Sequence, residues 1–268
     1  MEETNKFEDQ AEDMNESSNV ASLSDRKGLA RGIYLLPNLI TTGALFSGFY
    51  AIIAAMSGSL ENAAIAIVIA GFLDSLDGRI ARMTNTQSEF GVQYDSLSDL
   101  VAFGVAPAVL MFSWVLSDMG KIGWMISFLY MACAALRLAR FNTVPDSTVF
   151  FGLPSPAAAG VLAAFVWTWV DFFDPEVSIQ LTVIIAAFVA VAALLMVSNI
   201  RYYSPKHINL KGKVPFVYML GIVLLFTVIA MYPPGVLLCF GLVYGVSGPV
   251  QALLRKRKVF SKKKNTSE

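Results

Sequence analysis

Long apolar stretches alternate with short polar ones along most of the chain. A helix of about 20 apolar residues crosses the hydrocarbon core of a bilayer, and eight stretches approach this length. They predict membrane-spanning helices at residues 33–56, 62–83, 97–116, 122–141, 157–173, 179–200, 215–232 and 236–254. The second stretch carries charged residues and the fifth is short. The pattern predicts an all-α, polytopic membrane protein with eight transmembrane helices.

Composition supports this class and separates the two ends of the chain from its middle. Hydrophobic residues make up 56% of the 268 residues and charged residues only 15%, against about 25% charged residues in soluble domains. Residues 1–25 hold eight of the 20 acidic residues and few large apolar ones, which is typical of a disordered tail. We therefore expect a disordered acidic tail at 1–25, a membrane domain at 26–254 and a basic tail at 255–268.

The basic residues indicate how the chain is oriented in the membrane. If the N-terminus lies inside, only Lys121 of the 20 Lys and Arg residues falls in an outside connection. Such a bias favours a cytoplasmic location for both termini, in the cell (inner) membrane. The basic C-terminal run is typical of an anchor that touches anionic lipid rather than of a nucleic-acid site.

Four aspartates stand where membrane helices rarely carry charge. Asp74 and Asp77 are three residues apart in the second predicted span, and Asp95 and Asp99 are four apart at the start of the third. Each spacing places its pair on one helix face, and the short connection lets the four carboxylates converge. Asp95 alone could be explained as a helix cap. A charge near mid-bilayer costs about 2.5–3.5 kcal/mol, so the set indicates a function.

Carboxylates without His or Cys favour hard divalent ions, Mg²⁺ or Mn²⁺. Two such ions can stabilise the attacking and leaving oxygens of a displacement at phosphorus. Gly78, Ala81 and Gly91 lie beside the acids and would let a bulky ligand such as a nucleotide approach the backbone. Glycine in membrane helices also serves helix packing, so each small residue alone is weak evidence.

Residues 74–99 resemble the signature of the CDP-alcohol phosphatidyltransferase family at every fixed position. This signature is D-x2-D-G-x2-A-R-x8-G-x3-D-x3-D. The matching residues are Asp74, Asp77, Gly78, Ala81, Arg82, Gly91, Asp95 and Asp99. The resemblance implies that Asp74, Asp77 and Asp95 bind two metal ions, and that Asp99 completes the site and is the general base. It also implies that Gly78, Ala81, Arg82 and Gly91 line a CDP site, with CMP as the leaving group.

Further stretches resemble the phosphatidylserine synthase branch of that family. They are PNLITTGALFSGF, YDSLSDLVAFGVAPA, ALRLARFN, GLPSPAAAG and MVSNIRYYSPK. The resemblance implies CDP-diacylglycerol and L-serine as substrates, membrane lipid as the surroundings and a possible homodimer.

The residues of an acceptor site are predicted from their chemistry. Arg137, Arg140 and Arg201 lie at cytoplasmic helix ends, where guanidinium could bind a carboxylate or phosphate or simply anchor the helices. Asn142 and Ser155 could contact serine. Asn38 and Thr41 could reach the nucleotide, although Pro37 and Asn38 are also typical of a helix start.

Two alternatives stay open. Within the family, glycerol 3-phosphate or an inositol phosphate could be the acceptor, since the same arginines would suit a phosphate. Outside it, a cation transporter could use the aspartates as an ion pathway, but that function predicts acids distributed through the membrane and broken helices in related halves.

Overall fold

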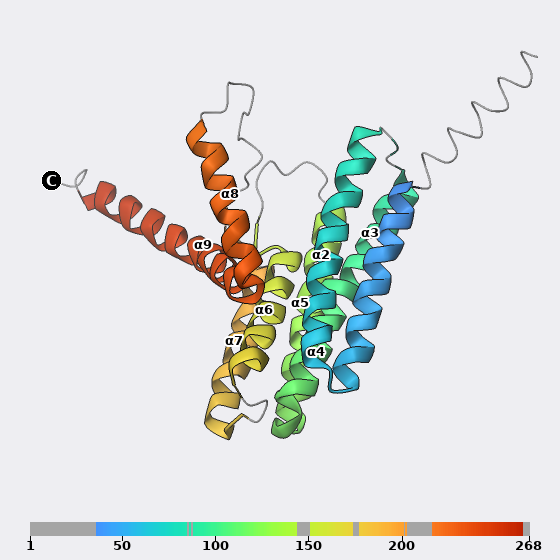
Figure 1. Cartoon of the computed structure of the whole chain (residues 1–268). Coiled ribbons are helices and arrows are strands. Elements are labelled where there is room, and N and C mark those ends of the chain that lie inside the picture. Colours follow the sequence, from blue (N-terminus) through green and yellow to red (C-terminus); the bar gives the residue numbers. More distant parts are fainter. Residues whose placement is uncertain are drawn as a thin grey trace, which may run out of the picture.

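The structure, a computed structural model, describes residues 36–84, 86, 88–143, 151–173, 177–200, 202 and 216–264. Within this part the chain forms helices and no strand. Most of the helices run side by side in a bundle that α9 leaves at an angle (Figure 1). They are the first helix Leu36–Met56, α2 Leu60–Met83, α3 Glu89–Asp99, η1 Leu100–Val105, α4 Ala106–Trp114, η2 Leu116–Met119, α5 Lys121–Thr143, α6 Ser155–Phe172, α7 Ile179–Val197, α8 Phe216–Met231 and α9 Pro233–Lys264.

Each predicted span coincides with a helix in the described residues, and the all-α, polytopic fold is confirmed. Six helices are long and apolar enough to cross a membrane: Leu36–Met56, Glu89–Trp114, Lys121–Thr143, Ser155–Phe172, Ile179–Val197 and Pro233–Ala252. The two remaining predicted spans are α2 and α8. Asp74, Asp77 and Arg79 interrupt the apolar pattern of α2, and α8 has only 16 residues. The count of eight crossings is therefore approximate.

The helices pack through small side chains. α6 lies between α2 and α9, and α5 packs along α7. The buried positions include many alanines, such as Ala51, Ala63, Ala70, Ala106, Ala134, Ala159, Ala163 and Ala193. In a membrane the lipid is as apolar as leucine, so close backbone approach through small residues is what favours helix association. Large apolar side chains such as Phe46 and Phe128 are exposed, as expected for surfaces that face lipid.

The third predicted span begins earlier than its hydropathy indicates. Ser88 precedes α3, and its Oγ accepts a hydrogen bond from the Gly91 amide at 3.0 Å. The helix therefore starts at Glu89 and not near residue 97. Asp95 lies inside the helix, so the interpretation of this residue as a helix cap is wrong.

A wider helical turn follows the aspartates directly. η1 is a π-helix that begins at Leu100, immediately after Asp99, and the Ala106 amide donates to the Val101 carbonyl. Such turns are frequent at functional sites. Because the winding changes there, the faces presented before and after Asp99 differ from those of a regular α-helix.

The first helix lies tightly against this region. A Cβ on Gly48 would come within 2.7 Å of the Ala102 Cα, so the helix approaches η1 at backbone distance. Ser47 Oγ donates to the carbonyl of Ala66 on α2 at 2.8 Å, in a buried position. The first helix is therefore fixed against both segments that carry aspartates.

Some predictions lie outside the described residues, namely the acidic tail at 1–25 and the position of Arg201. At the other end, α9 continues as helix to Lys264, past the predicted end of the last span at residue 254. The basic segment that follows this span is thus helical through most of its length.

Candidate active site

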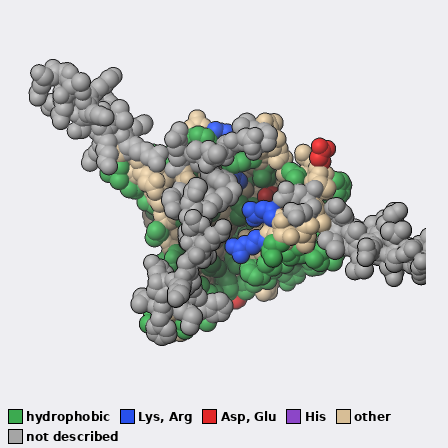
Figure 2. All heavy atoms as spheres, turned by 90° about the horizontal axis from the view of Figure 1, so that it is seen from above, with side chains coloured by type: hydrophobic (Ala, Val, Ile, Leu, Met, Phe, Trp, Pro, Cys, Tyr) green, Lys and Arg blue, Asp and Glu red, His purple; other side chains and the backbone are tan. Residues whose placement is uncertain are grey.

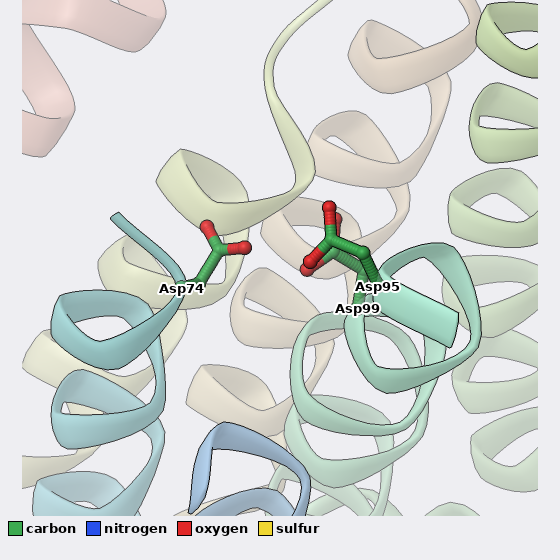
Figure 3. Close-up of side chains that lie close together, drawn as sticks. All are labelled: Asp74, Asp95 and Asp99. Atoms are coloured by element: carbon green, nitrogen blue, oxygen red, sulfur yellow. The ribbon is translucent and has the colours of Figure 1, made fainter. Parts of the chain in front are cut away.

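Three carboxylates meet between α2 and α3. Asp74 points from α2 toward Asp95 and Asp99, which come from α3 (Figure 3). Each of the three contributes a carboxylate oxygen, and these oxygens lie within 4.8 Å of one another. The spacing of four residues brings Asp95 and Asp99 onto one face of α3. The convergence predicted from the sequence is therefore present for these three residues.

The donor set of this cluster fits a divalent cation. Three ionised carboxylates at such distances repel one another, and a cation between them would remove this repulsion. Asp95 Oδ1 is buried and has no hydrogen-bond partner in the described part of the protein, an unusual condition for a polar atom. Carboxylate oxygens without nitrogen or sulfur ligands are the ones that Mg²⁺ and Mn²⁺ prefer. The cluster could hold a metal ion.

Asp77 differs from the other three aspartates. It is only 4% exposed, and its Oδ2 accepts a hydrogen bond of 2.6 Å from Thr41 Oγ1. Among the described residues it does not belong to the group of three carboxylates. The structure places it beside that group, on the side of α2 that faces the first helix.

A cavity of about 290 Å³ opens next to the carboxylates. It contains all six residues predicted to bind CDP, and both Asp77 and Asp95 belong to its wall. The lining residues are Pro37, Asn38, Thr41, Asp77, Gly78, Ala81, Arg82, Thr86, Ser88, Gly91, Val92 and Asp95. The first helix, α2 and α3 together build one cavity from residues far apart in the sequence.

Small side chains keep this cavity open. A Cβ on Gly91 would lie 3.1 Å from Ser88 Oγ and 3.4 Å from Asn38 Oδ1. A larger residue at this position would therefore crowd these two side chains at the cavity wall. Sequence reasoning missed Thr86 and Ser88, which also line the cavity. The position of Ser88 before an acidic and aromatic stretch is a helix-cap signal that could have identified it.

The end of the bundle that carries the cavity is also basic. Figure 2 looks onto the end that is uppermost in Figure 1, where α2 ends, and shows basic side chains beside a hollow. Arg82 lines the cavity, and its Nε donates to the Gly78 carbonyl at 2.8 Å. Positive charge at this end suits a ligand that carries phosphate.

Arg137 and Ser155 form a second polar group close to the cluster. Arg137, on α5, is 8% exposed, and its Nη1 donates to Ser155 Oγ at 2.8 Å. Its guanidinium lies over the Phe141 ring at 4.6 Å and interacts electrostatically with Asp99. Nε is buried and has no hydrogen-bond partner in the described part of the chain. A buried cation with an unused donor thus lies within electrostatic range of Asp99.

The other predicted acceptor residues are placed differently. The guanidinium of Arg140 lies over the Phe151 ring at 5.5 Å. Asn142 Nδ2 donates to Ser96 Oγ on α3 at 3.1 Å and is exposed. The structure therefore joins Arg137 with Ser155, whereas Asn142 connects α5 to α3.

A glycine turn precedes Ser155 and predicts a measurable effect. Gly152 has φ of 80°, and its amide donates to the Ile200 carbonyl at 2.9 Å. A Cβ there would collide with the Met196 carbonyl. Gly152→Ala is expected to destabilise the protein by about 1–3 kcal/mol, which would be measured as a lower thermal midpoint.

Gly160→Ala is the matched control for this prediction. Gly160 lies in the middle of α6, where a Cβ would meet nothing within 4 Å, so alanine should be neutral or slightly stabilising. Equal thermal midpoints for the two alanine variants would contradict the prediction.

Comparison with known proteins assigns the class. Residues 34–195 match the family model described as CDP-alcohol phosphatidyltransferase. This is more than half of the chain and includes the carboxylate cluster and the cavity. The chain belongs to the CDP-alcohol phosphatidyltransferase family.

Individual relatives extend the similarity beyond the matched domain. The chain is 36% identical over 232 residues to the CDP-diacylglycerol–serine O-phosphatidyltransferase of Helicobacter pylori strain J99, covering 84% of this chain and 97% of the relative. The protein of that name from Methanocaldococcus jannaschii is 34% identical over 221 residues, 82% of this chain and 96% of the relative. The archaetidylserine synthase of Methanothermobacter thermautotrophicus is 39% identical over 171 residues, covering 62% of this chain and 69% of the relative.

Proposed function

We propose that this chain transfers the phosphatidyl group of CDP-diacylglycerol to the hydroxyl of L-serine and releases CMP. One observation carries the proposal: Asp95 belongs both to the group of three carboxylates and to the wall of the cavity. A CDP group held in the cavity would therefore have its pyrophosphate beside the carboxylates.

The choice of acceptor is supported by two lines of argument. Relatives from Helicobacter and Methanocaldococcus carry serine in their names as the acceptor. In addition, the buried guanidinium of Arg137 has a free Nε and a partner hydroxyl in Ser155. Guanidinium binds a carboxylate in a planar, directional way, and serine provides a carboxylate. Glycerol 3-phosphate and an inositol phosphate are the alternative acceptors within the family.

The transfer can be written from the residues present. The serine hydroxyl oxygen attacks the phosphorus that carries diacylglycerol, and the P–O bond to CMP breaks. Asp99, in the cluster and near Arg137, accepts the hydroxyl proton. Arg137 holds the serine carboxylate, while Arg82 and the glycines of the cavity hold the CDP group. No covalent enzyme intermediate is required.

We assign the metal-holding role to Asp74, Asp77, Asp95 and Asp99, with two divalent ions, Mg²⁺ or Mn²⁺. When bound, such ions neutralise the pyrophosphate and stabilise the departing CMP. For Asp74, Asp95 and Asp99 the support is their neighbouring carboxylate oxygens and the unpartnered Asp95 Oδ1. For Asp77 the support is the family signature and its place in the cavity wall.

The proposed orientation places both termini and the site at the cytoplasmic face of the cell (inner) membrane. The support is the positive-inside pattern of the sequence together with Arg79 and Arg82 at the end of α2 that carries the cavity. Serine would then enter from the cytosol and CDP-diacylglycerol from the inner leaflet. A homodimer stays a prediction from the family resemblance.

The function is tested by CMP release from CDP-diacylglycerol with purified full-length protein and Mn²⁺ or Mg²⁺. Serine, glycerol 3-phosphate and an inositol phosphate are offered separately. We expect release with serine, loss of release with a chelator, and recovery when the metal is returned.

Each other outcome has a distinct meaning. Release only with another alcohol would keep the reaction and overturn serine as the acceptor. No release from folded protein with any alcohol would overturn the enzyme, and ion flux through reconstituted protein would then test the transporter. The gathering of the carboxylates at one end of one helix pair favours the enzyme (Figure 3).

A further inference from the structure

Thr41 connects the two helices that carry the aspartates. Its Oγ1 donates to Asp77 Oδ2 on α2 at 2.6 Å. Its backbone carbonyl accepts a hydrogen bond of 3.2 Å from Ser98 Oγ on α3. Both bonds are buried. Thr41 is thus bonded to Asp77 of α2 and to Ser98 of α3, the residue directly before Asp99 in the sequence.

The bond to Asp77 is short and well protected from water. Thr41 is 4% exposed and Asp77 is 4% exposed. Hydrogen bonds to an ionised carboxylate are shorter and stronger than those between neutral groups. The carbonyl of Pro37 lies 3.0 Å from the same hydroxyl, so Asp77 Oδ2 is the nearer of two acceptors. This bond restricts the rotation of the Asp77 carboxylate.

The first helix has little freedom to move away from this arrangement. Gly48 meets Ala102 of η1 at backbone distance, and Ser47 is bonded to the Ala66 carbonyl of α2. These contacts lie about two turns from Thr41, since a turn holds 3.6 residues. The position of the Thr41 hydroxyl is therefore set by packing elsewhere in the helix, which is what a rigid support for a ligand group requires.

We propose that Thr41 is a positioning residue, which fixes the Asp77 carboxylate at the cavity wall and keeps α2 and α3 in register around the carboxylate cluster. This inference deepens the proposed function and rests on it. It assigns the Thr41 hydroxyl to Asp77 and not to the nucleotide. Groups that orient metal ligands typically contribute 10–100-fold to metal affinity.

The test compares Thr41→Val, which removes the hydroxyl and keeps the shape, with Thr41→Ser, which keeps the hydroxyl. Full-length protein in nanodiscs is freed of metal with a chelator and titrated with Mn²⁺, and free Mn²⁺ is followed by electron paramagnetic resonance. We expect Thr41→Val to raise the Mn²⁺ dissociation constant by at least about tenfold. Thr41→Ser should stay within about threefold of the unchanged protein, as expected if the hydroxyl and not the methyl group acts.

Thr182→Val is the matched control. It also removes a buried hydroxyl, but this hydroxyl donates to the Ser178 carbonyl at the start of α7 and touches no aspartate. It should leave Mn²⁺ binding unchanged. Thr41→Ala gives a second variant without the hydroxyl in case valine disturbs the packing.

The outcomes separate this inference from the proposed function. Unchanged Mn²⁺ affinity in folded Thr41→Val or Thr41→Ala, or equal weakening in Thr41→Ser, would overturn the positioning role, even if serine-dependent CMP release persists. Conversely, if the unchanged protein binds Mn²⁺ but releases CMP with no alcohol, the proposed function fails. The Mn²⁺ affinities still decide the role of Thr41 in that case.

Discussion

Asp99→Asn is expected to lower serine-dependent CMP release by about 10²–10⁴-fold, the range that positioned general bases contribute. An amide has almost the same shape as a carboxylate, but it cannot take the proton of the serine hydroxyl. It is also a poorer ligand for a divalent ion. The measurement is kcat at saturating CDP-diacylglycerol, serine and Mn²⁺, with the protein in nanodiscs.

Asp118→Asn is the matched control for this variant. Asp118 lies in η2, is exposed, and does not belong to the group of three carboxylates. The kcat of Asp118→Asn should therefore equal that of the unchanged protein. A second comparison is the thermal midpoint, which should not fall in Asp99→Asn because the substitution removes repulsion within the cluster. If Asp99→Asn keeps more than about a tenth of the activity, Asp99 cannot be the general base.

The part of this protein that the sequence predicts best is the part set by local periodicity. Membrane spans follow from apolar length, so helices occur at all eight expected places among the described residues. The pairing of Asp95 with Asp99 follows from helical spacing alone. In both cases the decisive interactions lie within one helix, and neighbours along the chain determine them.

The features that the sequence did not predict depend on contacts between helices. The start of α3 was missed because residues 89–96 are too polar to extend an apolar span, although Ser88 caps the helix. The bond between Thr41 and Asp77 joins residues 36 positions apart. The periodicity of the sequence does not predict this contact, because the contact depends on how closely the first helix approaches α2.

Burial also distinguishes arginines that look alike in the sequence. Arg137 and Arg140 are three residues apart at the end of one helix. From the sequence alone, each could either anchor the helix or bind a ligand. The structure buries Arg137 against Ser155 and near Asp99, and places Arg140 over Phe151. Buried charge without full pairing is costly, so Arg137 has the stronger reason for a functional role.

Arg137→Lys is expected to raise the KM for serine by about 10–100-fold, with a smaller effect on kcat. Lysine keeps the positive charge but loses the planar arrangement of donors that fits a carboxylate. A hydrogen bond to a charged group is worth about 1.5–3 kcal/mol, which corresponds to this range. Initial rates of CMP release are measured against serine concentration at saturating CDP-diacylglycerol.

The control is Arg79→Gln, at the exposed end of α2 that carries the cavity. It removes a positive charge from the same end of the bundle without touching the Arg137–Ser155 pair, so the KM for serine should not change. If Arg137→Lys raised the KM for CDP-diacylglycerol and left the KM for serine unchanged, Arg137 would bind CDP-diacylglycerol and not serine. A fall in kcat alone would instead mean that Arg137 acts through Asp99, because the two side chains interact electrostatically.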